Sequence, residues 1–409
     1  MAHATYDFDA IVVGGGPAGL SAAGAAAKEG LRVAVIEKEP CIANSIRTSG
    51  VTWLTEGLDL PQGFYNPIRR YGISSPSREH VFETTEPEAC VLDVRKLYMH
   101  LAEKAAELGA KIFLRTEVNA ALYENEKNSV KVTAKSPRGS IDFRGELVID
   151  ASGFSTIVGT SLGLASRYKR FGIGAEYEVY AENVEIEKWE LMVGRAFSPA
   201  GYAWIFPLGR NKVRIGVGVG RPQSNEDPYE RLMNLLEKRP GPLKRLGRIC
   251  PLEFHSGVVP NEGPRGLTIG ERVLLVGDSA GHLNPLVLEG IRFAMKFGRI
   301  AGETAKQVVD NGDAKRVRPE KYEEIWKRDV WNNFQVGLDV QKKWLELSDE
   351  QWDKEMSMLE SLSGKEFLEL FRCQFSVVKL TRLAASHPEL LKSRFFSTIL
   401  GAKARKTLS

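Results

Sequence analysis

Cysteine is scarce in this chain of 409 residues, and it is never clustered. The four cysteines, Cys41, Cys90, Cys250 and Cys373, lie far apart without a C-x-x-C pair. This distribution disfavours a zinc or iron–sulfur site, so we expect no metal ligands. It is typical of a reducing compartment, although one disulfide would be compatible with it.

Long apolar runs are also absent. No run of 18 apolar residues occurs, and the N-terminus MAHATYDFDA lacks the cationic start and apolar core of a secretory signal. We therefore expect a cytoplasmic protein, or one attached only to a membrane surface. The formal net charge of +4 is spread along the chain, which gives no reason to expect nucleic acid as a partner.

The most informative segment that is present covers residues 8–38. Residues 10–13 form an apolar run typical of a buried strand, and Gly14, Gly16 and Gly19 follow at the G-x-G-x-x-G spacing. These glycines permit a sharp turn, the approach of a pyrophosphate and close packing of the next helix. That helix, over residues 17–29, directs its free amides at the phosphates.

A second strand, over residues 32–36, leads to an acid. The carboxylate of Glu37 can accept hydrogen bonds from both hydroxyls of a ribose. All five features occur in the order that a dinucleotide-binding unit requires: strand, glycine turn, helix, second strand and acid. Together they predict a dinucleotide site.

A further nucleotide-domain strand lies far along the chain, at residues 273–276. Gly277 and Asp278 close it, and this acid could hold a sugar alcohol chain. Pro285 ends the next loop, before a helix of small residues over 290–301. A cofactor with both a ribose and a ribityl chain fits this pair of features, and that cofactor is FAD. There is no second G-x-G-x-x-G, so no separate NAD(P)H domain is expected.

Two arginines between these segments have alternative interpretations. Arg47 lies in residues 40–60, which we expect to begin as a loop and then turn helical. Arg95 lies in the first turn of a helix over residues 91–108 that Asp93 is expected to cap. Each could reach the cofactor or remain a solvated surface residue. Strands are expected at 111–118, in a hairpin of 130–135 with 141–143, and at 147–153.

Residues 171–220 change to alternating strands alone, which predicts an antiparallel sheet with one covered face. On one strand Tyr202, Trp204 and Phe206 fall at period two, so their rings point to one face. Pro207 is expected to stop this strand. The three rings are either sheet core or the wall of a cleft.

These segments together resemble the geranylgeranyl reductase family, which belongs to the p-hydroxybenzoate hydroxylase-like flavoproteins. Besides the two nucleotide segments and Asn284-Pro285, the chain has that family's aromatic-x-Trp-x-Phe-Pro segment, followed some eight residues later by Gly216 and Gly218. The resemblance covers residues 8–310, roughly three quarters of the chain.

We accordingly predict an α/β fold in three parts. A Rossmann-like FAD-binding domain comprises residues 1–166 and 262–312, and an antiparallel-sheet substrate-binding domain is inserted at 167–261. A C-terminal helical region follows at 313–409.

The resemblance also implies roles for individual residues. The glycine turn and Glu37 would bind the ADP half of FAD, and the loop over 285–291 would face the isoalloxazine. An isoprenoid chain would bind along Tyr202, Trp204, Phe206 and Pro207. The residues expected to contact FAD are Gly14, Gly16, Pro17, Ala18, Gly19, Glu37, Lys38, Arg47, Arg95, Val118, Gly153, Gly277, Asp278, Gly281, Pro285, Gly290 and Ile291.

Two departures from the family pattern stand out. The run that precedes Gly290 is Val287-Leu288-Glu289, where the family often has glycines. The contacts of this loop with the flavin ring would therefore differ from the family pattern. Related hydroxylases typically have Asp-Gly where this chain has Ser152-Gly153.

Family members saturate isolated double bonds of geranylgeranyl groups in lipids or prenylated precursors, so the resemblance implies an FAD-dependent reductase. Such an alkene needs a flavin hydride at one carbon and a proton at the other, which makes alignment decisive. Candidate donors are Tyr202, His282 and an ordered water, although His282 could equally be an ordinary loop residue. The external electron donor would be NADPH or ferredoxin.

Two other functions stay open. The first is an FAD-dependent monooxygenase or halogenase of an aromatic substrate, which the missing Asp-Gly disfavours. The second is an electron-transfer flavoprotein, for which no cysteine cluster is present.

Beyond residue 313 the chain is helical and charged. In residues 375–409, apolar clusters such as Phe375, Val377 and Val378, and later Phe395, Phe396, Ile399 and Leu400, alternate with lysine and arginine. Such helices either lie on an anionic bilayer or cover a core with a solvated outer face.

Overall fold

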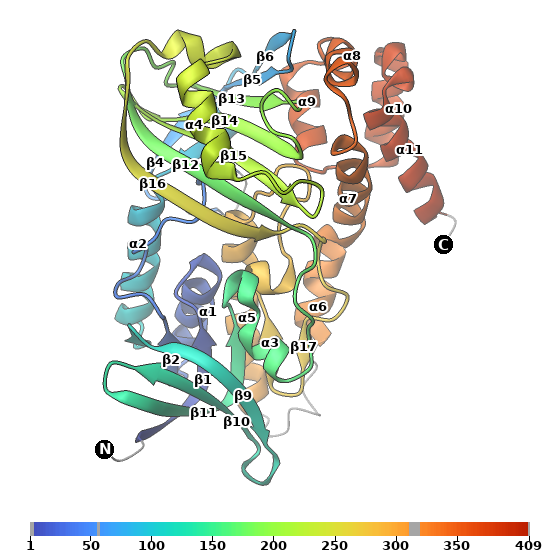
Figure 1. Ribbon diagram of the computed structural model, residues 1–409. Helices are drawn as coiled ribbons and strands as arrows, with labels where there is room; N and C mark the ends of the chain where they lie inside the picture. Colours follow the sequence, from blue (N-terminus) through green and yellow to red (C-terminus); the bar gives the residue numbers. More distant parts are fainter. Residues whose placement is uncertain (1–3, 55–57, 311–319, 408–409) are drawn as a thin grey trace.

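The computed structural model describes residues 4–54, 58–310 and 320–407. Figure 1 shows one sheet at the bottom, a second sheet at the top and the C-terminal helices along the right-hand side. The expected α/β fold with an antiparallel sheet and C-terminal helices is therefore confirmed.

The first sheet has the order β17-β18-β11-β1-β2-β8, and the strands β10 and β9 extend it from β11. The pairs β18–β11, β11–β1, β1–β2 and β2–β8 are parallel. Residues 10–13 are buried because parallel sheets are covered on both faces. The strands are β1 (Ala4–Val13), β2 (Val33–Ile36), β8 (Lys111–Phe113), β9 (Glu117–Glu124), β10 (Ser129–Ser136), β11 (Gly139–Asp150), β17 (Ile269–Gly270) and β18 (Val273–Leu275).

Four helices accompany this sheet: α1 (Pro17–Lys28), α2 (Val94–Glu107), α3 (Ile157–Ser161) and α5 (Ile291–Asp310). Helix α1 packs against both α2 and α5. Asp93 caps α2 as expected, since its carboxylate accepts the amide of Lys96 at 3.1 Å.

The structure corrects three expectations in this part. Residues 111–118 do not form one strand, because the chain turns between β8 and β9 at Arg115, whose φ is 51°. The strand expected at 147–153 is not a separate element: it is the end of the long β11, which stops at Asp150. In residues 40–60, the described part contains no helix but strand β3 (Val51–Trp53), whose β-branched residues favour extended pairing. It pairs with β7 (Ala89–Leu92), which also pairs with β4 (Tyr65–Ile68).

The second sheet has the order β16-β12-β15-β14-β13-β5-β6. Helix α4 (Pro228–Lys238) covers its outer face through Leu232 and Leu235. The inner face is directed toward the first sheet (Figure 1). Its strands are β5 (Arg70–Ser74), β6 (Glu79–Glu83), β12 (Phe171–Ala181), β13 (Lys188–Val193), β14 (Gly201–Gly209), β15 (Lys212–Arg221) and β16 (Ile249–Pro260).

This sheet departs from the sequence prediction in two ways. Strands β5 and β6 come from residues 70–83, so the sheet is not built from 167–261 alone. Pro207 does not stop β14, which continues to Gly209 through a register shift. The proline is tolerated because the ladder is irregular there.

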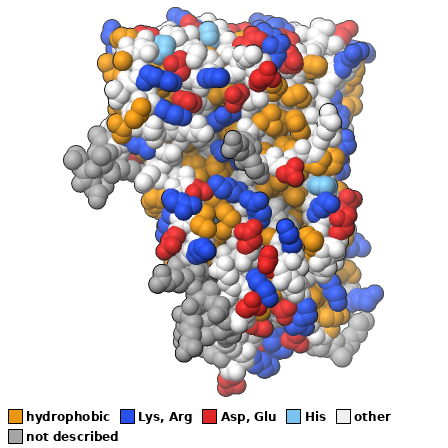
Figure 2. Space-filling view, turned by 180° about the vertical axis from the view of Figure 1, so that it is seen from behind, with side chains coloured by type: hydrophobic (Ala, Val, Ile, Leu, Met, Phe, Trp, Pro, Cys, Tyr) orange, Lys and Arg blue, Asp and Glu red, His pale blue; other side chains and the backbone are white. Residues whose placement is uncertain are grey.

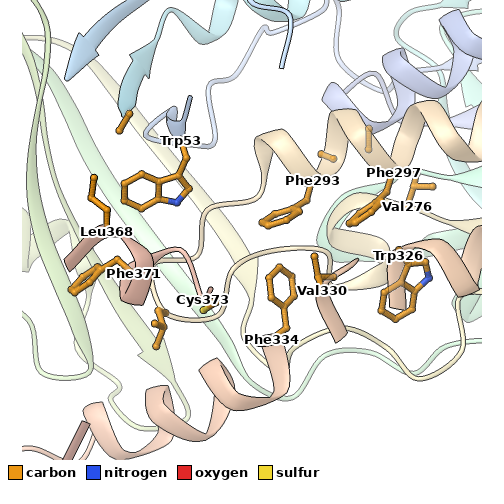
Figure 3. Packing of buried hydrophobic residues seen from close by; sticks show 14 of the residues in the cluster. Trp53, Val276, Phe293, Phe297, Trp326, Val330, Phe334, Leu368, Phe371 and Cys373 are labelled. Carbon is orange, nitrogen blue, oxygen red and sulfur yellow. The ribbon is translucent and has the colours of Figure 1, made fainter. Parts of the chain in front are cut away.

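The C-terminal region is helical where it is described, and the expected boundary between residues 312 and 313 lies outside the described residues. Figure 3 shows Phe334 beside Phe293 of α5, with ring centroids 5.0 Å apart, and Phe371 near Trp53. The helices are α6 (Glu320–Trp326), α7 (Asn332–Trp344), α8 (Asp349–Leu359), α9 (Gly364–Phe371), α10 (Val377–Ser386) and α11 (Arg394–Thr407), with a π-helical turn (Lys327–Trp331) before α7.

Most of the apolar clusters in residues 375–409 are part of the core. Phe375, Phe395, Phe396 and Ile399 are buried, so α11 is a covering helix. Across the ranges described above, none of the helices combines the length and apolarity needed to cross a bilayer. All four cysteines are free thiols. Lysine, arginine and acidic side chains are intermingled over the face seen in Figure 2.

Candidate functional site

The glycine turn joins β1 to α1 at one end of a large cavity. The φ of Gly14 is 112°, and a Cβ there would lie 2.3 Å from the carbonyl oxygen of Ala151. At Gly16, by contrast, a Cβ would meet nothing within 4 Å, so this side of the turn is open. Gly16 is the N-cap of α1 and provides no side-chain cap, which leaves the first amides available to an anion.

Glu37 follows β2 and lies beside this turn. Its Oε2 accepts the amide of Gly15 at 2.7 Å and its Oε1 accepts the amide of Glu39 at 2.8 Å. The carboxylate is thus held where the carboxyl end of β2 meets the turn. This is the position from which an acid reaches ribose hydroxyls in dinucleotide folds.

Asp278 lies on the other side of the same cavity, in the short turn after β18. Its side chain is half-buried, and no described residue donates a hydrogen bond to its carboxylate. Desolvation raises the pKa of Asp278 to about 6. A carboxylate directed into a cavity without a partner fits a ligand that carries hydroxyl groups, such as a ribityl chain.

The cavity has a volume of about 930 Å³ and is bounded by both sheets and by α7. Most of the residues expected to contact FAD line it. They are Gly14, Gly16, Pro17, Ala18, Glu37, Lys38, Arg47, Val118, Gly153, Gly277, Asp278, Gly290 and Ile291.

Four of the expected FAD residues lie outside this lining. Gly19 packs against the turn, where a Cβ would be 2.0 Å from the Gly14 oxygen, and Gly281 packs in the same way on Gly263. Arg95 instead forms an ion pair with Glu253 at 2.8 Å. Pro285 lies behind the lining, and its carbonyl accepts a hydrogen bond from Gln341.

The aromatic strand contributes two of its three rings to the cavity. Successive ring centroids of Tyr202, Trp204 and Phe206 are 5.9 and 6.0 Å apart, so the expected common face is present. Tyr202 and Trp204 line the cavity, but Phe206 and Pro207 do not. Phe206 is buried against Trp189, because this part of β14 lies over the core rather than the cavity.

Trp204 lies flat across a surface that lacks side chains. A Cβ on Gly216 would be 2.3 Å from its indole, and the corresponding distances are 3.6 Å for Gly218 and 3.7 Å for Gly174. The indole Nε1 donates to Oε2 of the buried Glu176 at 2.7 Å. The Gly-x-Gly pair therefore makes room for the tryptophan, and Glu176 sets its orientation.

The two candidate proton donors occupy different environments. The hydroxyl of Tyr202 donates to the carbonyl of Val287 at 2.6 Å, and burial raises the pKa of Tyr202. His282 lies outside the cavity lining, enclosed by the rings of Phe297 and Trp326, with centroids 4.9 and 4.8 Å away. Burial lowers the pKa of His282 to about 3, so the imidazole is neutral.

Sequence reasoning missed several residues that line the cavity. Gln341 and Trp344 of α7, and Leu345 directly after it, belong to the region for which no motif was found. Glu176 and His255 also line it. A signal for Glu176 existed, because Gly172, Gly174 and Glu176 alternate along β12 and a charged residue at an inward position is unusual.

The residues that line the cavity fit FAD on structural grounds. The open glycine turn with free amides suits a pyrophosphate, and Glu37 stands at the ribose position. The unpartnered Asp278 suits the ribityl chain. The apolar and aromatic residues between the sheets leave space for a ring system and an apolar substrate.

Comparison with known proteins agrees with this geometry. The FAD dependent oxidoreductase family model matches residues 9–172, and the geranylgeranyl reductase catalytic domain model matches residues 171–259. Digeranylgeranylglycerophospholipid reductase 2 of Methanothermobacter thermautotrophicus is 30% identical over 394 residues, which cover 94% of this chain and 98% of that protein.

Solved structures of similar fold include a reductase-like protein and a halogenating flavoenzyme. A geranylgeranyl bacteriochlorophyll reductase-like protein from Thermoplasma acidophilum has a TM-score of 0.82 and 25% identity, covering 95% of this chain and 98% of the other. A flavin-dependent brominase has a TM-score of 0.67 at 17% identity, covering 98% and 99% of the two chains. At that identity the brominase shows a common fold and nothing about activity.

Proposed function

This chain belongs to the geranylgeranyl reductase family of FAD-dependent oxidoreductases, and we propose that its substrate is a glycerophospholipid that carries two geranylgeranyl chains. It reduces isoprenoid double bonds of lipids with FAD as its cofactor. The observation that carries the choice of substrate is the cavity, which runs from the phosphate-binding turn to the apolar residues of β14 and α7. Such a cavity suits a long apolar chain beside a nucleotide.

Reduced FAD supplies a hydride when it is bound. The residues of the chain align the substrate and shape the cavity around it. The indole of Trp204, held by Glu176, provides a flat apolar surface against which a chain can be aligned. Tyr202 anchors the loop over 285–291 through its bond to Val287. Trp344 and Leu345 line the cavity on the side of α7, where their apolar side chains would help to exclude water from a bound chain.

The decisive experiment is mass spectrometry of the digeranylgeranyl lipid after incubation with the dithionite-reduced holoenzyme. We expect products that have gained successive pairs of hydrogens. Dithionite replaces the external donor, so the choice between NADPH and ferredoxin does not affect the outcome. If the lipid is unchanged although a free geranylgeranyl compound is reduced, the glycerophospholipid assignment is wrong.

We also propose that the C-terminal region contacts an anionic bilayer, from which the lipid would enter. Val377 and Val378 at the start of α10 are 59% and 80% exposed, and Leu391 is 54% exposed. The exposed cations Arg382 and Lys392 lie in the same segment of the chain. Apolar residues with neighbouring cations are typical of segments that bind anionic membrane surfaces.

Sedimentation with phosphatidylglycerol vesicles tests this contact. Val378→Glu should reduce the bound fraction severalfold, because it places a negative charge in the apolar contact. Met233→Glu on α4 is the control, since Met233 is 41% exposed but lies on the second sheet. Equal loss in both variants, or in neither, would contradict the proposed surface.

A further inference from the structure

Three ionisable side chains form a line from the molecular surface to the cavity. Glu176 of β12 lines the cavity, and its Oε1 lies 3.0 Å from Nδ1 of His255, its cross-strand partner on β16. Nε2 of His255 lies 3.6 Å from Oε1 of Glu253. The side chain of Glu253 is 40% exposed, whereas those of His255 and Glu176 are only 3% and 5% exposed. The strands β12 and β16 lie side by side in Figure 1.

The bonding of His255 is incomplete. Its Nε2 is buried and has no hydrogen-bond partner among the described residues. Unlike Nδ1, which faces Glu176, this nitrogen is therefore available to accept a proton. Glu176 is better satisfied, because Trp204 donates to it at 2.7 Å and Nε of Arg214 lies 3.7 Å from its Oε1.

Glu253 is held beside His255 by a cation. Arg95 of α2 donates to Glu253 at 2.8 Å, and this hydrogen bond lowers the pKa of Glu253. The carboxylate of Glu253 therefore stays ionised at neutral pH beside the imidazole. The distance of 3.6 Å is too long for a direct hydrogen bond, but one bridging water or a small rotation of the exposed Glu253 side chain closes it.

We propose that Glu253, His255 and Glu176 relay protons from solvent to the double bond in the cavity. The proposal rests on the proposed function, the reduction of a lipid double bond. Each such reduction breaks one π bond and forms two C–H bonds. One new bond uses the hydride that reduced FAD supplies, and the other uses a proton from the Glu176 carboxyl group. The relay is needed because a lipid chain that fills the cavity excludes water from it.

The order of the three groups suits this chemistry. After Glu176 has given up its proton, neutral His255 takes a proton at Nε2 from solvent through Glu253 while its Nδ1 passes a proton to the Glu176 carboxylate. When the product leaves, water in the cavity that His255 lines returns the ring to its Nδ1–H form. Glu176 is the final donor because its carboxyl group lies beside the indole of Trp204, which can stabilise positive charge that develops on the carbon.

The test follows flavin reoxidation after dithionite-reduced holoenzyme is mixed with a digeranylgeranyl lipid, in H₂O and in D₂O. His255→Gln can keep a hydrogen bond to Glu176 but cannot pass a proton. We expect it to slow reoxidation about 100-fold and to raise the solvent isotope effect. Glu253→Gln should slow reoxidation by about threefold to tenfold, since the exposed end of the relay can be bypassed by water. The affinity of the oxidised protein for the lipid should be unchanged in both variants.

A pH profile and chemical rescue separate a relay from a structural role. The groups that face His255 are Glu176 from β12 and Glu253 from β16, with Arg214 from β15 and Arg95 from α2 each paired to one of these carboxylates. The decline of the wild-type rate with rising pH should flatten in His255→Gln. Added imidazole should restore part of the rate of His255→Ala.

The control is Glu187→Gln, which breaks an ion pair with Arg69 far from the relay at a site that is 48% exposed. Rates of His255→Gln and Glu253→Gln within twofold of the wild-type rate would overturn the relay, as would equal losses in Glu253→Gln and the control. If the wild-type holoenzyme reduces no prenyl lipid, the proposed function is wrong and the relay falls with it. The two failures are thus distinguishable.

Discussion

At the scale of single residues, the space left by glycine is as important as the aromatic side chains. Gly216 has no Cβ, and the indole of Trp204 occupies the position where one would be. We expect Gly216→Ala to displace the indole and to lower the rate of lipid reduction about tenfold or more, since forced overpacking costs about 1–3 kcal/mol. Mass spectrometry of the products gives the rate, and flavin absorbance shows whether FAD is retained.

Gly209→Ala is the matched control on the neighbouring strand. A Cβ at Gly209 would meet nothing within 4 Å, so this variant should reduce the lipid at the wild-type rate. A fully active Gly216→Ala protein would show that the position of Trp204 is not important.

Asp278 gives a prediction about pH. Its pKa is raised from 3.8 to about 6 in the folded protein, so the folded state binds a proton more readily than the unfolded state between these values. The FAD-free protein should therefore lose stability as the pH rises through this range. Asp278→Asn should abolish the loss and raise the free energy of unfolding at pH 8 by ~1 kcal/mol, a value reduced for partial exposure.

Urea unfolding of the FAD-free wild type and variant, at several pH values from about 4 to about 8, checks this linkage. The same substitution should weaken FAD binding about tenfold, because a hydrogen bond to a charged acceptor is lost. Parallel stability curves for the two proteins would refute the assignment of the raised pKa to Asp278.

At the scale of elements, the close packing of α1 and α5 sets the position of the phosphate-binding turn. A Cβ on Gly298 would lie 2.3 Å from the carbonyl oxygen of Ala18, and one on Gly302 would lie 2.2 Å from that of Ala22. We expect Gly298→Ala to push the helices apart, to lower the free energy of unfolding by about 2 kcal/mol and to weaken FAD binding. Denaturant unfolding and FAD titration are the measurements.

Gly401→Ala in α11 is the control for this change. A Cβ there would meet nothing within 4 Å, so the substitution should leave stability unchanged or raise it by about 0.5–1 kcal/mol, as expected for a helical glycine. If Gly298→Ala were equally harmless, close helix packing would not determine the site.

Some helices and strands could be predicted from the sequence and others could not. Sequence patterns predicted α1, α2 and the strands β12, β13, β14 and β15 of the second sheet, but not its strands β5, β6 and β16. Short strands such as β3 were missed, because their pairing with β7 depends on contacts across some forty residues. The expected end of β14 at Pro207 was wrong for the same reason, since the irregular ladder that accepts the proline is a property of its neighbours.

At the scale of the whole molecule, the cavity lies between the two sheets and α7 and has walls from all three parts. Bound FAD should therefore stabilise the protein as one unit. At a free FAD concentration one hundred times the dissociation constant, the gain is about 2.7 kcal/mol. Calorimetry should show one transition that moves to higher temperature with FAD. A transition that splits, with only one part shifted, would indicate that the parts unfold independently.

By itself the sequence determined the dinucleotide turn, the acid after β2, the Gly-Asp segment and the aromatic strand, because each of these is a local pattern whose meaning is set by backbone geometry. Only the tertiary structure decided which side chains meet in the cavity. Trp344 lies at the site although its region has no motif, and His282 and Phe206 lie in the core. His255 lies opposite Glu176. These outcomes depend on how distant strands and helices pack, and no local pattern encodes that packing.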